Sequence, residues 1–302
     1  IMLEQLNKVY ELGSHDRQLS TRFTKALGTL ATDIREEEII KVYGIDAPYY
    51  YLTESLCWPI LEEIIKSKLM TEPMEVNERM RELLLKMPVG STVLTVVRLV
   101  EQMALYYNQT KSIGTLKLNT PEEYVQQYVN EYYLMDMFYR RALEAYHELV
   151  TLDIPIEAVI NEAKRQLDQE YAKMANVMNL EWLTCVKEKR EAFREVTLER
   201  QENFYRNEGD GAVKQVIIVS DALRYEVAVE LMQQLAKEKH IATLTPYLAM
   251  LPTETKYCKP ALLPHHSLGM LGTEMLVDGT VLNTTDQRTA HLCKYKEGAV
   301  CM

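Results

Sequence analysis

The chain has 302 residues and a formal net charge of −10 at pH 7. This length leaves room for about two domains and a sizeable core. The acidic excess lies in the first 212 residues, which hold 25 basic and 35 acidic side chains, whereas residues 213–302 hold nine of each. Nonspecific nucleic-acid binding needs cations that neutralise phosphates, so the acidic part disfavours that function and favours a protein partner.

The cysteines and the hydropathy of the chain indicate the cellular compartment in which the protein works. The five cysteines are odd in number and show no CxxC spacing, which indicates reduced thiols rather than a disulfide framework. No apolar run approaches the ~20 residues that a membrane-spanning helix needs. The N-terminal residues also lack the charged-then-apolar profile of a signal peptide. The sequence therefore predicts a soluble, cytoplasmic protein.

Residues 1–208 predict an acidic region of successive helices without a defensible repeat. Apolar and capping patterns predict helices over 14–27 and 55–65, a helix that starts at Thr120, and one or two long charged helices over 156–205. At the third start, Thr120 is the expected N-cap, Pro121 the first helical residue, and Glu123 the partner in a capping box. The tyrosines that follow indicate a helix-packing seam rather than an aromatic binding platform: Tyr124, Tyr128, Tyr132, Tyr133, Tyr139 and Tyr146.

Residues 209–302 predict a second, α/β domain. The polar, glycine-containing stretch 207–211 is the sharpest break in the chain, and we place the boundary there. After it the pattern alternates between strands and helices, which favours a parallel or mixed sheet with right-handed crossovers. The expected elements are a strand over 215–220, a helix over 225–239, a strand over 241–250, a short helix, and a strand over 275–277. Only about ninety residues are left for this domain, which is few for a complete doubly wound fold.

Asp221 is the first candidate functional residue. It directly follows the Val/Ile run 216–219, which is typical of a strand buried on both faces. Ligands of open α/β sheets bind at the carboxyl ends of such strands, so a carboxylate there suits a metal ion or a phosphate-bearing ligand. The structural alternative is that Asp221 caps the helix that follows it.

Thr253 and Thr255 lie at the next predicted strand-to-helix turn. Either threonine could simply cap the short helix. The functional alternative makes Thr255 a nucleophile at a helix N-terminus, where the unpaired N–H groups and the helix dipole favour negative charge. A threonine hydroxyl is a weak nucleophile unless it is activated, so this role requires a metal ion, and Asp221 would supply part of that site.

The other polar residues of this region are interpreted as structural. Consecutive His265 and His266 point in different directions on most backbones, so we interpret both as loop residues. Asp278 with Gly279 is typical of a turn. Asp286 and His291 are five residues apart, which is a poor spacing for a shared metal on one helix face.

Four motifs in this region resemble the PglZ family of phage-defence proteins of the BREX systems, which is classed in the alkaline phosphatase superfamily. They are Val219-Ser-Asp-Ala-Leu-Arg-Tyr-Glu226, Met250-Leu-Pro-Thr-Glu-Thr-Lys256, Ala261-Leu-Leu-Pro-His265 and Val277-Asp-Gly279. They occur in the family's order and cover residues 214 to about 280. The first two are also similar to motifs of nucleotide pyrophosphatase/phosphodiesterases.

This resemblance implies a function and roles for two residues. Asp221 matches the first metal-binding aspartate, Thr255 matches the nucleophile that also contacts metal, and Thr253 matches a threonine that is not the nucleophile. The implied activity is a two-metal phosphatase or phosphodiesterase, with Zn²⁺ as the expected cation, that forms a phosphothreonine intermediate. The implied partners are other defence-system proteins and a phosphate-ester substrate, including nucleic acid.

The chain also departs from that family's pattern. No Asp-His dipeptide follows Thr255, and Asp286 and His291 do not have the spacing of the superfamily's later metal ligands. The family's proteins are much longer than 302 residues. We therefore expect this chain to be a fragment that ends inside its phosphatase domain, binds metal weakly and does not turn over.

Two other functions remain open from the sequence. In the first, the phosphatase-like fold is a non-catalytic scaffold, and the acidic helices recruit other subunits of a defence complex. The second is a Rossmann-like nucleotide binder. The absence of glycine from the turn after residue 220 disfavours it, because the backbone could not approach a pyrophosphate closely.

Overall fold

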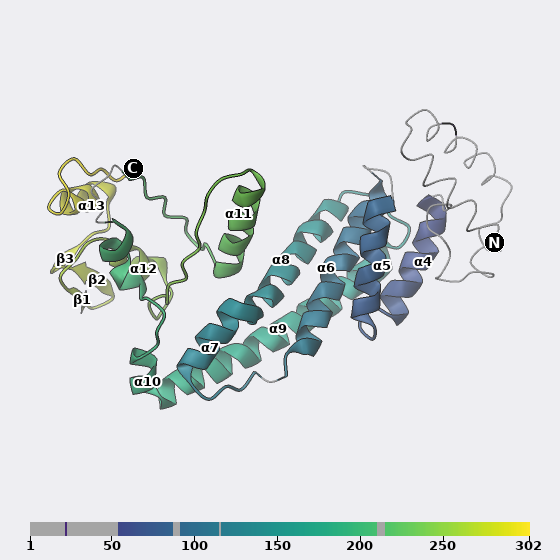
Figure 1. Ribbon diagram of the computed structural model, residues 1–302, viewed down its shortest axis with the longest axis horizontal. Coiled ribbons are helices and arrows are strands. Elements are labelled where there is room, and N and C mark those ends of the chain that lie inside the picture. The colour runs from purple at the N-terminus through teal and green to yellow at the C-terminus, as the bar shows by residue number, and fades with distance from the viewer. Residues whose placement is uncertain (1–21, 23–53, 87–90, 115, 210–214) are drawn as a thin grey trace. The chain divides into compact units, whose positions relative to one another are not determined.

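The computed structural model describes residues 22, 54–86, 91–114, 116–209 and 215–302 (Figure 1). The helix predicted over 14–27 lies outside these residues except for residue 22. The chain divides into two compact units. One comprises Ile1–Lys117 and Leu134–Glu181, and the other comprises Leu118–Tyr133 and Trp182–Met302. The boundary that the sequence suggests near residue 208 stays a prediction.

The first unit is helical. Its described elements are α4 (Glu54–Ser67), α5 (Pro73–Lys86), α6 (Thr92–Ser112), α8 (Tyr133–Leu149) and α9 (Glu157–Glu188), the last of which belongs to this unit as far as Glu181. Helix α6 packs against both α4 and α5. Ser91 begins α6 as its N-cap, since its side chain accepts the Val93 N–H at 3.2 Å. Large apolar side chains from all five helices form the core, including Ile64, Met80, Leu99, Met103, Met135 and Leu167.

The tyrosines packed within each unit confirm that this series is a packing seam. In the first unit the Tyr139 ring stacks on that of Tyr171 with centroids 3.7 Å apart. In the second unit Tyr124 is buried with its ring edge-on to Trp182, and Tyr133 packs against Tyr225. Rings in these arrangements are held by other side chains and offer no open platform.

The second unit begins with α7 (Pro121–Gln127) and the π-helix η3 (Tyr128–Tyr132). Thr120 is the N-cap of α7 and accepts the Glu123 N–H at 3.2 Å, which confirms the predicted helix start. The Glu123 carboxylate accepts the N–H of Asn119 at 2.8 Å, one residue before the position that a capping box would use.

The later part of this unit contains short elements. They are α10 (Arg190–Arg194), η4 (Gln201–Asn203), η5 (Tyr205–Gly209), α11 (Tyr225–Lys237), α12 (Thr255–Ala261), β1 (Leu268–Leu271), β2 (Glu274–Val277), β3 (Thr280–Val281) and α13 (Thr285–Leu292). Helix α12 packs on β2, and Figure 1 shows it beside the three strands. The predicted helix after residue 224, the short helix at Thr255 and the strand near 275–277 are all present.

The sheet differs from the prediction. Its three strands run in the order β1-β2-β3, and both pairs are antiparallel. Two-residue turns join the strands, and such short connections permit only antiparallel pairing. At the second turn Asp278 and Gly279 both have positive φ, +48° and +75°, as a type I′ hairpin turn requires. The parallel or mixed sheet that we expected is absent from the described residues.

Two predicted strands are also absent from the described residues. Residues 215–220 form no strand, and the side chains of Val216 and Ile218 are 80% and 86% exposed. In 241–250 the pairing is a single parallel bridge between Leu248 and Arg200. An apolar run becomes a strand only when a neighbouring strand pairs with it, and in the described part of the chain no strand pairs with either segment.

The helices of the described residues include none with the length and hydropathy needed to cross a membrane. All five cysteines are free thiols, and two of them, Cys57 and Cys185, are buried.

Candidate functional site

Asp221 lies in an exposed turn directly after the extended segment 215–220. The next residue, Ala222, has a φ of +56°, an uncommon value for a residue with a Cβ. The Ala222 N–H donates to Asp221 Oδ1 at 3.0 Å. Asp221 does not cap α11, because the N-cap of that helix is Arg224. The turn therefore leaves the Asp221 carboxylate available to groups outside its own segment.

Thr255 is the first residue of α12, and its hydroxyl meets that carboxylate. Its Oγ1 donates toward Asp221 Oδ1 and Oδ2, at 3.2 Å and 3.3 Å. The N-cap of α12 is Glu254, without a side-chain capping bond, so neither Thr253 nor Thr255 is the N-cap of this helix. The structure therefore brings together two residues that the sequence places 34 positions apart, and both side chains are exposed.

The spacing of the Asp221 and Thr255 oxygens suits neighbouring ligands of one cation. Two oxygens bound to a tetrahedral Zn²⁺ at about 2.0 Å lie about 3.3 Å from each other. A carboxylate and a hydroxyl are also the hard oxygen donors that Mg²⁺ and Mn²⁺ accept. In the described ranges no cluster of three or more histidine, cysteine or acidic side chains could hold a metal. This pair therefore fits one part of a metal site.

Two ion pairs flank the candidate site, and the sequence did not predict either. Arg224 Nη2 lies 2.7 Å from Oε1 of Glu226, whose side chain is fully buried in the first turn of α11. Lys256, next to Thr255, lies 3.1 Å from Glu254. Hydrogen bonds with Tyr257 and then Glu254 raise the pKa of Lys256, so this side chain is a cation beside the threonine. In the sequence, the only sign of these two ion pairs was a charged residue at each of the two turns that hold Asp221 and Thr255.

The remaining candidates have structural roles, as we interpreted them. His265 Nδ1 is 2.7 Å from the Leu263 carbonyl, and the buried His291 has Nε2 2.6 Å from the Pro264 carbonyl. The Asp278 carboxylate closes its turn by accepting the N–H groups of His266 and Ser267. Asp286 lies in the first turn of α13, which Thr284 begins with a capping box.

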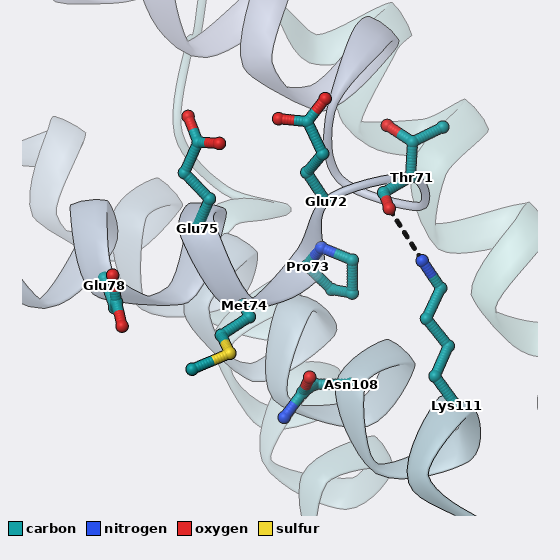
Figure 2. Close-up of a pocket in the computed structure, with 8 residues that line it drawn as sticks. All are labelled: Thr71, Glu72, Pro73, Met74, Glu75, Glu78, Asn108 and Lys111. Atoms are coloured by element: carbon teal, nitrogen blue, oxygen red, sulfur yellow. Dashed lines mark hydrogen bonds between the residues drawn. The ribbon is translucent and has the colours of Figure 1, made fainter.

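An acidic hollow of about 460 Å³ lies in the helical unit, and Figure 2 shows the side chains that line it. Glu72, Glu75 and Glu78 line it together with Lys111, whose ammonium donates to the Thr71 carbonyl at 2.7 Å. Lys68 pairs with both Glu72 and Glu75, at 3.3 Å and 2.7 Å. Because two of these three carboxylates are already neutralised, the hollow gives no second candidate metal centre.

Comparison with known proteins shows which part of the chain is similar to a known family. A family model described as "BREX system PglZ alkaline phosphatase-like domain" matches residues 203–301. The chain is 26% identical over 182 residues to the alkaline phosphatase-like protein PglZ of Bacillus cereus, covering 58% of this chain and 21% of that protein. It is 38% identical over 112 residues to the alkaline phosphatase-like protein BrxZ of Escherichia coli, covering 33% of this chain and 13% of that protein. No solved structure matches the chain significantly.

Proposed function

We propose, from the match of residues 203–301 to the BREX system PglZ alkaline phosphatase-like domain, that these residues supply a nucleophile and a metal ligand for phosphate-ester hydrolysis. The observation that carries this proposal is the contact between Thr255 Oγ1 and the Asp221 carboxylate at 3.2 Å. A hydroxyl and a carboxylate 34 residues apart meet at two turns, and neither side chain is used to cap a helix.

The two residues have distinct roles. Thr255 Oγ1 attacks the phosphorus atom, an O–P bond forms, and the bond from phosphorus to the leaving alcohol breaks. The Asp221 carboxylate orients the hydroxyl toward the substrate and accepts its proton as Oγ1 attacks, and that proton then passes to the departing alkoxide, which leaves as the alcohol. Water then hydrolyses the phosphothreonine ester and regenerates the hydroxyl. A bound divalent cation would lower the pKa of the hydroxyl and neutralise charge that develops on the phosphoryl oxygens.

The remaining ligands of such a site belong, in this proposal, to residues outside the 302. The two relatives are covered to 21% and 13% of their lengths, so most of a protein of that size lies elsewhere. The substrate is a phosphate ester, with nucleic-acid phosphodiesters within that class. The partners are the other proteins of the defence system.

The test uses a longer protein that contains this sequence and has the full length of these relatives. Its hydrolysis of bis-p-nitrophenyl phosphate is measured with and without Zn²⁺ or Mn²⁺. We expect metal-dependent turnover, and a loss of at least about 1000-fold in kcat for Thr255→Ala. Asp221→Ala should cost about 100-fold or more, because it removes a charged ligand. Thr253→Ala is the matched control and should stay within about two-fold of the parent protein.

The variants separate two outcomes. Equal activity in the Thr253→Ala and Thr255→Ala proteins would remove the nucleophile from the proposal. A folded, metal-loaded protein without any turnover would favour the non-catalytic scaffold, in which the domain only binds partners.

A further inference from the structure

A second cavity lies in the helical unit between α6 and α9 and has a volume of about 320 Å³. Its apolar wall includes Tyr106 and Tyr107 from α6 and Met174 and Val177 from α9. All four residues belong to the same compact unit. The volume falls at the lower end of the range of pockets that bind small molecules, and an aromatic and apolar lining is typical of them.

Tyr106 is the unusual residue of this wall. Its side chain is fully buried, and its hydroxyl has no hydrogen-bond partner among the described residues. Nearby tyrosines are satisfied, since Tyr171 donates to Asp136 at 2.8 Å and Tyr139 donates to Asp168 at 3.1 Å. A buried hydroxyl without a partner is costly, and such a group is usually explained by a ligand, an ion or an ordered water.

Charged side chains line the exposed edge of the same cavity. Lys173 is exposed, and within the described ranges it makes no hydrogen bond or ion pair. Lys111 also lines the cavity but donates to the Thr71 carbonyl. Burial and then the charge of Glu170 raise the pKa of Tyr107 to about 12, so its hydroxyl is a neutral donor at physiological pH. The cavity thus combines an apolar wall, two phenol groups, the Glu170 carboxylate and two lysine ammonium groups, of which only that of Lys173 has no partner among the described residues.

We propose that this cavity binds a small aromatic anion. The ring lies between the tyrosines of α6 and the apolar side chains of α9, a ring acceptor accepts a hydrogen bond from the Tyr106 hydroxyl, and the anionic group meets the Lys173 ammonium. Nucleotides and aromatic carboxylates share this chemistry. The site belongs to residues that are distinct from Asp221 and Thr255, and it requires no phosphate-ester hydrolysis.

The test is isothermal titration calorimetry of the 302-residue chain with adenosine monophosphate and, separately, with indole-3-acetate. We expect one-to-one binding of at least one probe, and the probe that binds more tightly identifies the source of the ligand. Val177→Trp fills the cavity and should weaken binding at least about ten-fold. Val150→Trp changes an exposed valine outside the cavity and should leave binding unchanged. Failure of both probes to bind, or equal weakening by both tryptophan variants, would overturn the proposal.

Tyr106→Phe provides a second measurement that a purely structural role would not reproduce. Loss of one hydrogen bond to the ligand should weaken binding about five-fold. In the ligand-free protein the same change removes an unsatisfied buried hydroxyl and should raise Tm by about 2–4 °C. A lower Tm would show that the hydroxyl already has a partner inside the protein, and would contradict the assignment.

Discussion

The Thr255 hydroxyl donates to a carboxylate from a turn 34 residues earlier in the chain. Two local features make this contact possible. The turn at Asp221 includes a residue with positive φ, and α12 begins with Glu254 as its N-cap. Since both side chains are exposed, a cation or a substrate can reach them. At this scale the structure pairs a threonine hydroxyl with a carboxylate acceptor, which is the arrangement that the proposed nucleophile needs.

Asp278 gives a residue-scale prediction about pH. Desolvation acts to raise its pKa, but hydrogen bonds from the Tyr295 hydroxyl and from the Ser267 and His266 N–H groups hold that pKa well below its usual range. The ionised carboxylate therefore stabilises the folded state at every pH above about 4, and this contribution is lost as the pH falls further. We expect Asp278→Asn to lower Tm at pH 7 and the difference from the parent to shrink below about pH 4.

Thermal denaturation followed by circular dichroism between pH 2 and pH 7 measures this difference, with pH values chosen about the ordinary carboxyl pKa. Asp153→Asn is the matched control, because Asp153 is exposed in the other unit. A difference for Asp278→Asn that is constant across the whole pH range would contradict the assigned hydrogen bonds.

At the scale of elements, the sequence predicted helix caps and turns correctly, but it did not predict which strands pair. Thr120 with Pro121 marked a true helix start, and Asp278 with Gly279 marked a true turn, because caps and turns depend on a few adjacent residues. The run Val216–Val219 indicated a buried strand, but burial depends on partners that no short window of sequence contains. Of the candidate site, the pattern suggested both residue types and both turns. It could not show that Thr255 and Asp221 are in contact.

The exposed run 216–219 gives an element-scale prediction. Ile218 is 86% exposed, so Ile218→Lys should change the free energy of unfolding of the 302-residue chain by no more than about 0.5 kcal/mol. Val229 is buried in α11, and Val229→Lys is the matched comparison, with an expected loss of about 2 kcal/mol or more. Urea denaturation measures both values. Comparable destabilisation by the two lysines would mean that residues 216–219 are buried as the sequence pattern suggested.

At the scale of the whole molecule, the chain combines a helical unit with residues 203–301, which match the BREX system PglZ alkaline phosphatase-like domain. The matched regions cover 21% and 13% of the two relatives, and the described residues contain no cluster of three or more histidine, cysteine or acidic side chains that would complete the proposed site of Asp221 and Thr255. Two oxygen donors hold a divalent cation weakly, because structural zinc sites use four ligands and catalytic sites use three from the protein.

We therefore expect the 302-residue chain to bind zinc only weakly. After incubation with Zn²⁺ and gel filtration in metal-free buffer, the protein should retain less than one zinc ion per chain and should not hydrolyse phosphate esters. Elemental analysis by mass spectrometry measures the retained metal. Stoichiometric zinc together with hydrolysis that disappears in Thr255→Ala would contradict the expectation that further ligands are needed.

The most direct test of the central claim is to trap the covalent intermediate. A protein as long as the relatives that contains this sequence would be mixed with Zn²⁺ and bis-p-nitrophenyl phosphate and quenched in acid within the first turnover. Peptide mass spectrometry would then locate the modified residue. The expected result is a phosphoryl adduct on Thr255 that is absent from the Asp221→Ala protein. Turnover with an unmodified Thr255, or with the adduct on Thr253, would contradict the account.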